Sequence, residues 1–133
     1  MTNLLALIAA LVLVESHGDL RALRDDTLAA GPLQIRPIYV EDVNRIAGTS
    51  YQYPDDCWSM SNSVAMFRIY VGHYATAKRI GREPTLEDMA RIHYGGPRGW
   101  RWKSTKQYWH DVQDAHAHPW KYRRFPHGLR SPF

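Results

Sequence analysis

The sequence predicts a single, mainly α-helical domain, and three observations carry that prediction. The chain has 133 residues, a length that suits one domain. Apolar residues recur at helical spacing in several segments, and no segment shows the alternation of a half-buried strand. The composition, 44% hydrophobic and 23% charged, is ordinary for a folded protein and excludes disorder of the whole chain.

The apolar run at residues 4–14 has two interpretations. Its length fits the core of a signal peptide and is too short to span a bilayer. However, no Lys or Arg precedes it, no small-x-small cleavage site follows it, and it continues directly into Glu15. We therefore predict a helix buried on most sides that ends at Glu15, with a signal peptide as the alternative. Apolar packing and the negative end of a helix both favour the protonated carboxyl group that a general acid needs.

The next segments alternate between loop and helix. Residues 17–36 contain glycine, proline and scattered polar residues, which predict a long loop or a small irregular sheet. A helix is expected over 38–47, because Pro37 lies near its start and Gly48 just past its end. Residues 48–58 are rich in turn-forming residues and predict another connection.

The second half of the chain predicts three further helices. The longest is expected over 59–80, where apolar residues recur at helical spacing. The T-L-E-D segment at 85–88 resembles a capping box that begins a helix ending near residue 93. Three glycines and a proline predict a loop over 95–99, and Ser and Thr at 104–105 are expected to cap a last helix to about residue 115.

The basic charge is concentrated near the C-terminus. The formal net charge is +4, yet residues 113–133 carry four Lys or Arg against one Asp, so residues 1–112 are close to neutral. The last 21 residues also contain three prolines and lack regular periodicity. We therefore expect a domain at 1–112 followed by a basic, proline-containing strap or tail at 113–133.

The composition indicates the class of ligand but does not distinguish between its members. The chain has 5 Trp, 8 Tyr and 3 Phe, which with a basic excess suits ligands that stack and carry negative charge. Wall polysaccharides and nucleic acids both meet this description. The one cysteine, Cys57, excludes an intramolecular disulfide framework and a cysteine-built zinc site.

Four short segments occur in an order that is typical of one enzyme superfamily. They are E-S at 15–16, G-P-L-Q-I at 31–35, A-R-I-H-Y-G-G-P at 90–97 and Y-W at 108–109. Together they resemble the lytic transglycosylase and goose-type lysozyme superfamily, and most closely its short single-domain versions from bacteriophages and bacteria. The resemblance covers roughly residues 4–112. It implies a lysozyme-like α fold and cleavage of the β-1,4 bond between N-acetylmuramic acid and N-acetylglucosamine in peptidoglycan.

The resemblance also implies roles for individual residues. Glu15 corresponds to the catalytic acid, Ser16 and Gln34 to groups near the sugar, and Tyr108 to a hydroxyl that lines the cleft. Each residue also has a purely structural interpretation. Ser16 could bond the backbone at a helix end, Gln34 could satisfy nearby amides in its loop, and Tyr108 could place its ring in the core.

A second carboxylate would separate hydrolysis from cyclisation. A hydrolase usually activates water with another Asp or Glu, whereas a transglycosylase uses the 6-hydroxyl of muramic acid as an internal nucleophile. Asp25 occupies the position of one goose-type aspartate and is our candidate for this role. Arg36 stands where the resemblance would place a further aspartate, so the sequence leaves both outcomes open.

The loop motif departs from the superfamily at one position. Tyr94 stands where an asparagine is usual before the double glycine, and it could stack on a sugar or fill space. Tyr94 and Gly95 are nevertheless expected to bind substrate, because the glycines mark a backbone that passes close to another element or to the ligand. No cofactor and no metal site are expected.

The hypothesis is thus a peptidoglycan-cleaving enzyme that acts on the cell wall, in the periplasm or outside the cell. It would be a phage endolysin, released with a holin or by another route because no clear signal peptide is present, or a wall-remodelling enzyme. We expect a monomer whose tail holds anionic wall or outer-membrane components, with no nucleic-acid partner. The alternatives are a catalytically silent peptidoglycan-binding module and, ranked lower, a basic nucleic-acid-binding protein.

Overall fold

Helices dominate the computed structural model, which describes residues 1–123. Within that range strand-type pairing is limited to two isolated antiparallel bridges, Leu23 with Ala30 and Ala30 with Ile35. The prediction of a mainly α-helical domain is confirmed. The helices are α1 (Leu4–Ser16), α2 (Pro37–Ala47), α3 (Met60–Tyr74), α4 (Ala77–Ile80), α5 (Leu86–Gly95) and α6 (Lys106–Ala117), with 3-10 turns η1 (Asp55–Trp58), η2 (Gly99–Arg101), η3 (Lys103–Thr105) and η4 (Pro119–Lys121).

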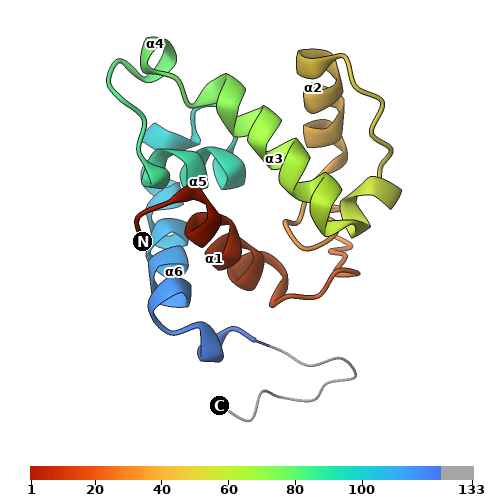
Figure 1. Ribbon diagram of the computed structural model, residues 1–133, viewed down its shortest axis with the longest axis horizontal. Helices are drawn as coiled ribbons and strands as arrows, with labels where there is room; N and C mark the ends of the chain where they lie inside the picture. Colours follow the sequence, from red (N-terminus) through yellow and green to blue (C-terminus); the bar gives the residue numbers. More distant parts are fainter. Residues whose placement is uncertain (124–133) are drawn as a thin grey trace.

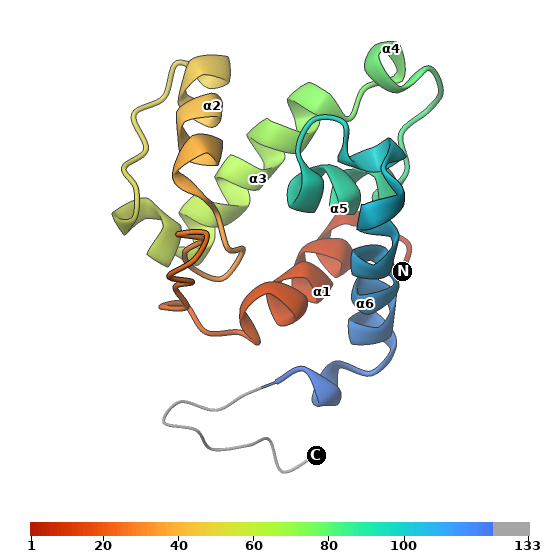
Figure 2. The ribbon, with the colours of Figure 1, turned by 180° about the vertical axis from the view of Figure 1, so that it is seen from behind.

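Helix α1 is the apolar run of the sequence, and most of it is buried in the core, while Leu5 on its outer face is 70% exposed. The helix packs against α6 and α5, and these three helices form one half of the fold. Helices α2 and α3 pack against each other and form the other half with the loop over 17–36 (Figures 1 and 2). The contact between α3 and α5 joins the two halves. Leu7 and Leu11 are fully buried in the core. None of the helices within residues 1–123 is long and apolar enough to cross a membrane.

The helix starts and ends follow the local sequence signals in most places. Asn3 caps α1 by accepting a hydrogen bond from the backbone N–H of Ala6. Gly48 ends α2 in the left-handed conformation, as the sequence predicts. The capping box at the start of α5 is present in full, because Thr85 and Asp88 each accept a hydrogen bond from the other's backbone N–H.

The expected helix over 59–80 is two helices. Helix α3 ends at Tyr74, Ala75 leaves the helical conformation, and α4 begins at Ala77. The side chain of Thr76 accepts a hydrogen bond from the backbone N–H of Arg79 and so caps a new helix. The apolar periodicity continues through this break, which is why the sequence pattern alone predicts one helix.

The C-terminal part differs from the expected boundary at residue 112. Helix α6 continues to Ala117, and η4 follows it, so residues 113–121 are largely helical rather than an irregular strap. Ala115 is fully buried, and the Nδ1 of His17 lies 2.7 Å from the backbone oxygen of Tyr122 and donates to it. This segment therefore folds back on the end of α1. The remainder of the predicted tail, residues 124–133, lies outside the described residues.

Candidate active site

An open cleft of about 1000 Å³ lies between the two halves of the fold. One wall comes from the end of α1, the end of α5 and the following loop, and the start of α6. The other comes from the loop over 17–36 and from α2. Among the lining residues are Glu15, Arg24, Gln34, Arg36, Tyr39, Asp42, His93, Tyr94, Gly95 and Tyr108.

Glu15 is held at the edge of this cleft by two buried residues. Its Oε2 accepts a hydrogen bond of 2.9 Å from the Tyr108 hydroxyl and lies 3.4 Å from the Nε2 of His93. The Glu15 side chain is 15% exposed, whereas Tyr108 is 6% exposed. Because the partners come from α5 and α6 while Glu15 ends α1, three helices fix the carboxyl group and leave one side of it open to the cleft.

His93 is a buried ring with a partner at each nitrogen. Its Nε2 lies 2.9 Å from the carbonyl oxygen of Leu33, and its Nδ1 lies 3.0 Å from the Tyr39 hydroxyl. A carbonyl oxygen only accepts, so Nε2 carries a proton and donates to Leu33, while Nδ1 pairs with the Tyr39 hydroxyl. The same Nε2 lies 3.4 Å from the Oε2 of Glu15. His93 thus contacts Glu15, the 31–35 segment and α2.

The two tyrosines of this cluster act as hydrogen-bond donors at neutral pH. Burial, the charge of Glu15 and the hydrogen bond to Glu15 raise the pKa of Tyr108 well above 10.0. Burial, with smaller contributions from Tyr70 and Glu15, does the same to the pKa of Tyr39. Tyr108 therefore keeps the proton that it donates to Glu15, and it also lines the cleft.

Tyr94 and Gly95, which we expect to bind substrate, both line the cleft. Tyr94 is 53% exposed, and its ring stacks on the Tyr108 ring with centroids 4.2 Å apart and an interplanar angle of 16°. It therefore offers its outer face to a ligand. A Cβ at Gly95 would lie 2.7 Å from the Thr105 side chain, so this glycine allows the cleft loop to pack against the start of α6.

Gln34 reaches the cleft from a strained position in the 31–35 segment. Its φ is +51°, and its Nε2 donates to the carbonyls of Ala22 and Gly31 at 3.2 and 3.1 Å. These two acceptors fix which end of the amide is nitrogen. Its Oε1 is the buried side-chain polar atom that has no hydrogen-bond partner within residues 1–123.

Ser16 has the structural role that was its alternative interpretation. It is 5% exposed and is not among the residues that line the cleft. Its hydroxyl lies 3.0 Å from the carbonyl of Val12 and 2.9 Å from that of Pro32, and it donates to these acceptors. Ser16 thereby ties the end of α1 to the segment that carries Gln34.

Asp25 does not lie where the sequence predicts a second carboxylate. Its side chain is exposed and it does not line the cleft. Leu23 and Ala30 pair in an antiparallel bridge, so Asp25 lies in the turn at the tip of this loop. Arg24 lines the cleft in its place. Its pKa is raised chiefly by Asp26, at 3.3 Å, and more weakly by the charge of Glu15.

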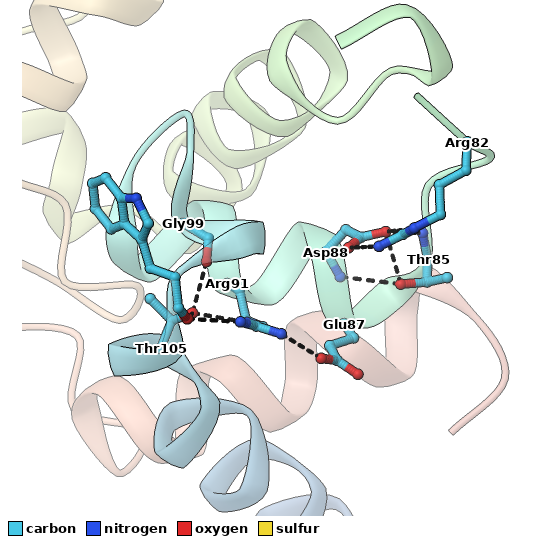
Figure 3. Close-up of polar contacts among 8 residues, drawn as sticks. Arg82, Thr85, Glu87, Asp88, Arg91, Gly99 and Thr105 are labelled. Atoms are coloured by element: carbon cyan, nitrogen blue, oxygen red, sulfur yellow. Dashed lines mark hydrogen bonds and ion pairs between the residues drawn. The ribbon is translucent and has the colours of Figure 1, made fainter. Parts of the chain in front are cut away.

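A polar network behind the cleft fixes the loop between α5 and α6 (Figure 3). The buried Arg91 donates to Glu87, to the hydroxyl of Thr105 and to the carbonyl of Trp102. Thr105 in turn donates to the carbonyl of Gly99 at 2.7 Å. Thr105 therefore does not cap α6 with its side chain, contrary to the sequence prediction, because its hydroxyl is committed to this network.

A separate cluster with a second ion pair anchors the start of α5 (Figure 3). Asp88 is 2% exposed and accepts two hydrogen bonds from Arg82, at 2.6 and 2.9 Å. Burial opposes the charge, but hydrogen bonds from Arg82 and Thr85 outweigh it and hold the pKa of the Asp88 carboxyl below its usual range. Both ends of α5 are thus fixed, which keeps His93 and Tyr94 in register with α1 and α6.

The chain is similar to lysozymes in sequence and in fold. A lysozyme of Magallana gigas is 39% identical over 85 residues, which are 63% of this chain and 58% of that protein. The chain therefore spans less than two thirds of the length of this relative. No family model matches the chain.

Solved structures extend the likeness to the fold. The crystal structure of Meretrix lusoria lysozyme in complex with Aeromonas hydrophila PliI matches 82% of this chain and 87% of that chain, with a TM-score of 0.68 and 26% identity. An inhibitor-bound lysozyme from Meretrix lusoria matches with the same coverage and identity and a TM-score of 0.67. The lysozyme-like fold is confirmed. These relatives support the lysozyme part of the resemblance found in the sequence.

Sequence reasoning assigned no role to His93, Tyr39 or Arg24. His93 lies inside the A-R-I-H-Y-G-G-P segment and could have been found there, two residues before Gly95. Tyr39 and Arg24 carry no comparable signal, because they reach the cleft only through the packing of α2 and the turn of the 17–36 loop. Among residues 1–123, His, Cys, Asp and Glu form no group of three that could hold a metal ion.

Replacing Tyr108 by Phe tests how the acid is held. The ring and its stacking on Tyr94 remain, while the hydroxyl that donates to Glu15 is lost. A hydrogen bond to a charged group contributes about 1.5–3 kcal/mol, so kcat on a peptidoglycan substrate should fall by about tenfold or more. Tyr51→Phe, which removes a hydroxyl away from the cleft, is the matched control. Equal activity of the two variants would mean that Tyr108 does not position Glu15.

Proposed function

We propose that the protein cleaves the β-1,4 bond between N-acetylmuramic acid and N-acetylglucosamine in peptidoglycan, with Glu15 as general acid. The observation that carries the proposal is a carboxyl group held by Tyr108 and His93 at the edge of an open cleft. The similarity to lysozymes in sequence and fold supports the same substrate. The cleft is large enough for a glycan. If Glu15 had only a structural role at the end of its helix, it would not need to line such a cleft.

The chemistry follows from the position of the carboxyl group. Glycosidic cleavage requires a proton for the leaving oxygen and stabilisation of an oxocarbenium-like transition state. Glu15 lines the cleft, and its contacts with Tyr108 and His93 both fall on Oε2, so we expect the proton on Oε1 to be the one offered to a bound glycan. The hydrogen bond donated by Tyr108, with the Nε2 of His93 3.4 Å away, then stabilises the carboxylate that remains after proton transfer.

Two further residues suit a sugar with an acetamido group. The unpartnered Oε1 of Gln34 is an acceptor that an N-acetyl N–H would satisfy. The exposed ring of Tyr94 offers an apolar face to the sugar ring, backed by Tyr108. Tyr94 therefore replaces the amide of the usual asparagine with a stacking surface.

Clearing of purified peptidoglycan tests the proposal against its rivals. The active protein should lower the turbidity of the suspension and release soluble muropeptides. A silent wall-binding module would sediment with the peptidoglycan and release nothing. A nucleic-acid binder would leave the wall untouched and retain DNA in a salt-sensitive manner. Either of the last two results would overturn the proposed activity.

After protonation, we expect the 6-hydroxyl of the muramic residue itself, rather than a water molecule, to attack the sugar. Asp25 is outside the cleft lining, and the 17–36 loop presents the guanidinium of Arg24 there. Of the other acidic residues that line the cleft, Asp42 is engaged by Arg45 and Tyr74, Asp111 accepts from Gln107, and Glu41 is exposed on α2. Attack by the muramic 6-hydroxyl needs no second carboxylate, and its proton returns to Glu15.

Digestion in ¹⁸O-labelled water measures this directly. Internal attack yields muramic ends that carry no label and are lighter by one water than a hydrolytic product. Asp25→Asn should cleave at a rate within about twofold of the unchanged protein, as is usual for an exposed substitution. Labelled reducing ends, which the relatives' name favours, together with a large loss in Asp25→Asn, would instead restore Asp25 as the group that activates water.

The proposed activity places the site of action at the cell wall. A role in phage release or wall remodelling would follow from the same chemistry. Binding of anionic wall components by the C-terminal segment also remains a proposal, because Arg124 and Arg130 lie outside the described residues.

A further inference from the structure

Arg36 differs from the other two arginines that line the cleft. Arg24 pairs with Asp26 and Arg45 pairs with Asp42. Within residues 1–123, no hydrogen bond or ion pair engages the exposed guanidinium of Arg36. The cleft therefore presents one cation whose charge is available to a ligand.

The surroundings of Arg36 leave its positive charge uncompensated. It is the N-cap residue of α2, and the first turn of that helix contains no acidic residue. The N-terminal end of a helix is itself partially positive. The nearest acid along α2 in this cleft is Glu41, beyond the first turn, and the next, Asp42, already accepts from Arg45 and Tyr74.

Gln34, close to Arg36, offers a second group that a ligand could bind. Gln34 is 9% exposed, and its Oε1 is a buried acceptor without a partner among residues 1–123, while its Nε2 donates to two carbonyls. Two residues along an extended chain span at most about 7 Å, so Gln34 and Arg36 are neighbours on one wall. A ligand that satisfies both carries an N–H donor close to an anion.

Muramic acid has this arrangement on adjacent ring carbons. Its acetamido group is on C2, and the lactyl ether on C3 ends in a carboxyl group, which is free in peptide-free strands and bears the acidic stem peptide elsewhere. We propose that Arg36 binds a carboxylate carried on the C3 substituent of the muramic residue whose acetamido N–H meets Gln34. Arg36 is thereby a specificity-determining residue that separates muramic acid from N-acetylglucosamine. This inference rests on the proposed function.

The test compares kcat/KM on three substrates for the unchanged protein and for Arg36→Met. The substrates are peptide-free glycan strands, the same strands with the lactyl carboxyl converted to a methylamide, and strands that bear stem peptides. Arg68→Met, an exposed arginine on α3 outside the cleft, is the matched control. A charge-assisted hydrogen bond corresponds to a preference of about tenfold or more.

The expected result is a preference for the free carboxylate over the methylamide that is lost in Arg36→Met, retained in Arg68→Met and weakened by added salt. A loss confined to stem-bearing strands would assign the contact to a stem carboxylate instead. A preference unchanged by Arg36→Met, or a uniform loss on all three substrates, would overturn the inference. If the unchanged protein cleaved no substrate, the proposed function itself would fail.

Discussion

Glu15→Gln is expected to lower the rate of peptidoglycan clearing by a factor of about 10²–10⁴, the usual contribution of a general acid. The substitution removes the transferable proton and keeps the size of the side chain. The glutamine oxygen can still accept from the Tyr108 hydroxyl, at 2.9 Å from Glu15 in the present structure. The measurement is the initial rate of turbidity loss for both proteins at equal concentration.

Binding and stability serve as controls for this variant. Sedimentation with insoluble peptidoglycan should be retained in Glu15→Gln, because the cleft residues Gln34, Arg36 and Tyr94 are unchanged. The melting temperature should stay close to that of the unchanged protein. Equal clearing by the two proteins would show that Glu15 is not the acid, whatever the variant's affinity for the wall.

Gly31→Ala is expected to cause the largest loss of stability. Gly31 has a φ of +81°, and a Cβ built there would lie 1.8 Å from the backbone oxygen of Cys57. The left-handed conformation costs about 1–2 kcal/mol for a residue with a Cβ, and overpacking adds about 1–3 kcal/mol. The free energy of unfolding should therefore fall by about 2–5 kcal/mol, measured by thermal or urea denaturation.

Gly18→Ala separates the two contributions to this loss. Gly18 has a similar φ of +85°, but a Cβ added there would meet no atom within 4 Å. This variant should lose only the conformational part, about 1–2 kcal/mol. Equal losses in both variants would show that the contact between the 31–35 segment and η1 does not constrain the fold.

Local signals made most of the fold predictable from the sequence. The apolar run indicated α1 because its hydrophobicity has no polar face, and Thr85 with Asp88 marked the start of α5. The break at Thr76 was missed because a single capping hydroxyl competes there with an apolar period that continues through it. Thr105 was misassigned because its hydroxyl bonds Gly99 and Arg91, which no local pattern encodes.

The residues of the candidate site were likewise predictable only in part. Glu15, Gln34, Tyr94, Gly95 and Tyr108 all line the cleft and could be selected from short motifs. Asp25 could not be placed from spacing alone, because the bridge between Leu23 and Ala30 decides which residue of that loop faces the cleft. The role of His93 depends on contacts with Leu33 and Tyr39, which lie 60 and 54 residues away in the sequence.

Mass spectrometry of digested peptide-free glycan strands is the most direct test of the central claim. The unchanged protein should yield fragments that all end in a muramic residue, whether cyclised or reducing, and Glu15→Gln should bind the strands and leave them uncut. Fragments that end in N-acetylglucosamine, or strands that the unchanged protein binds but never cuts, would contradict the assignment of Glu15 as the acid of a muramic-bond-cleaving enzyme.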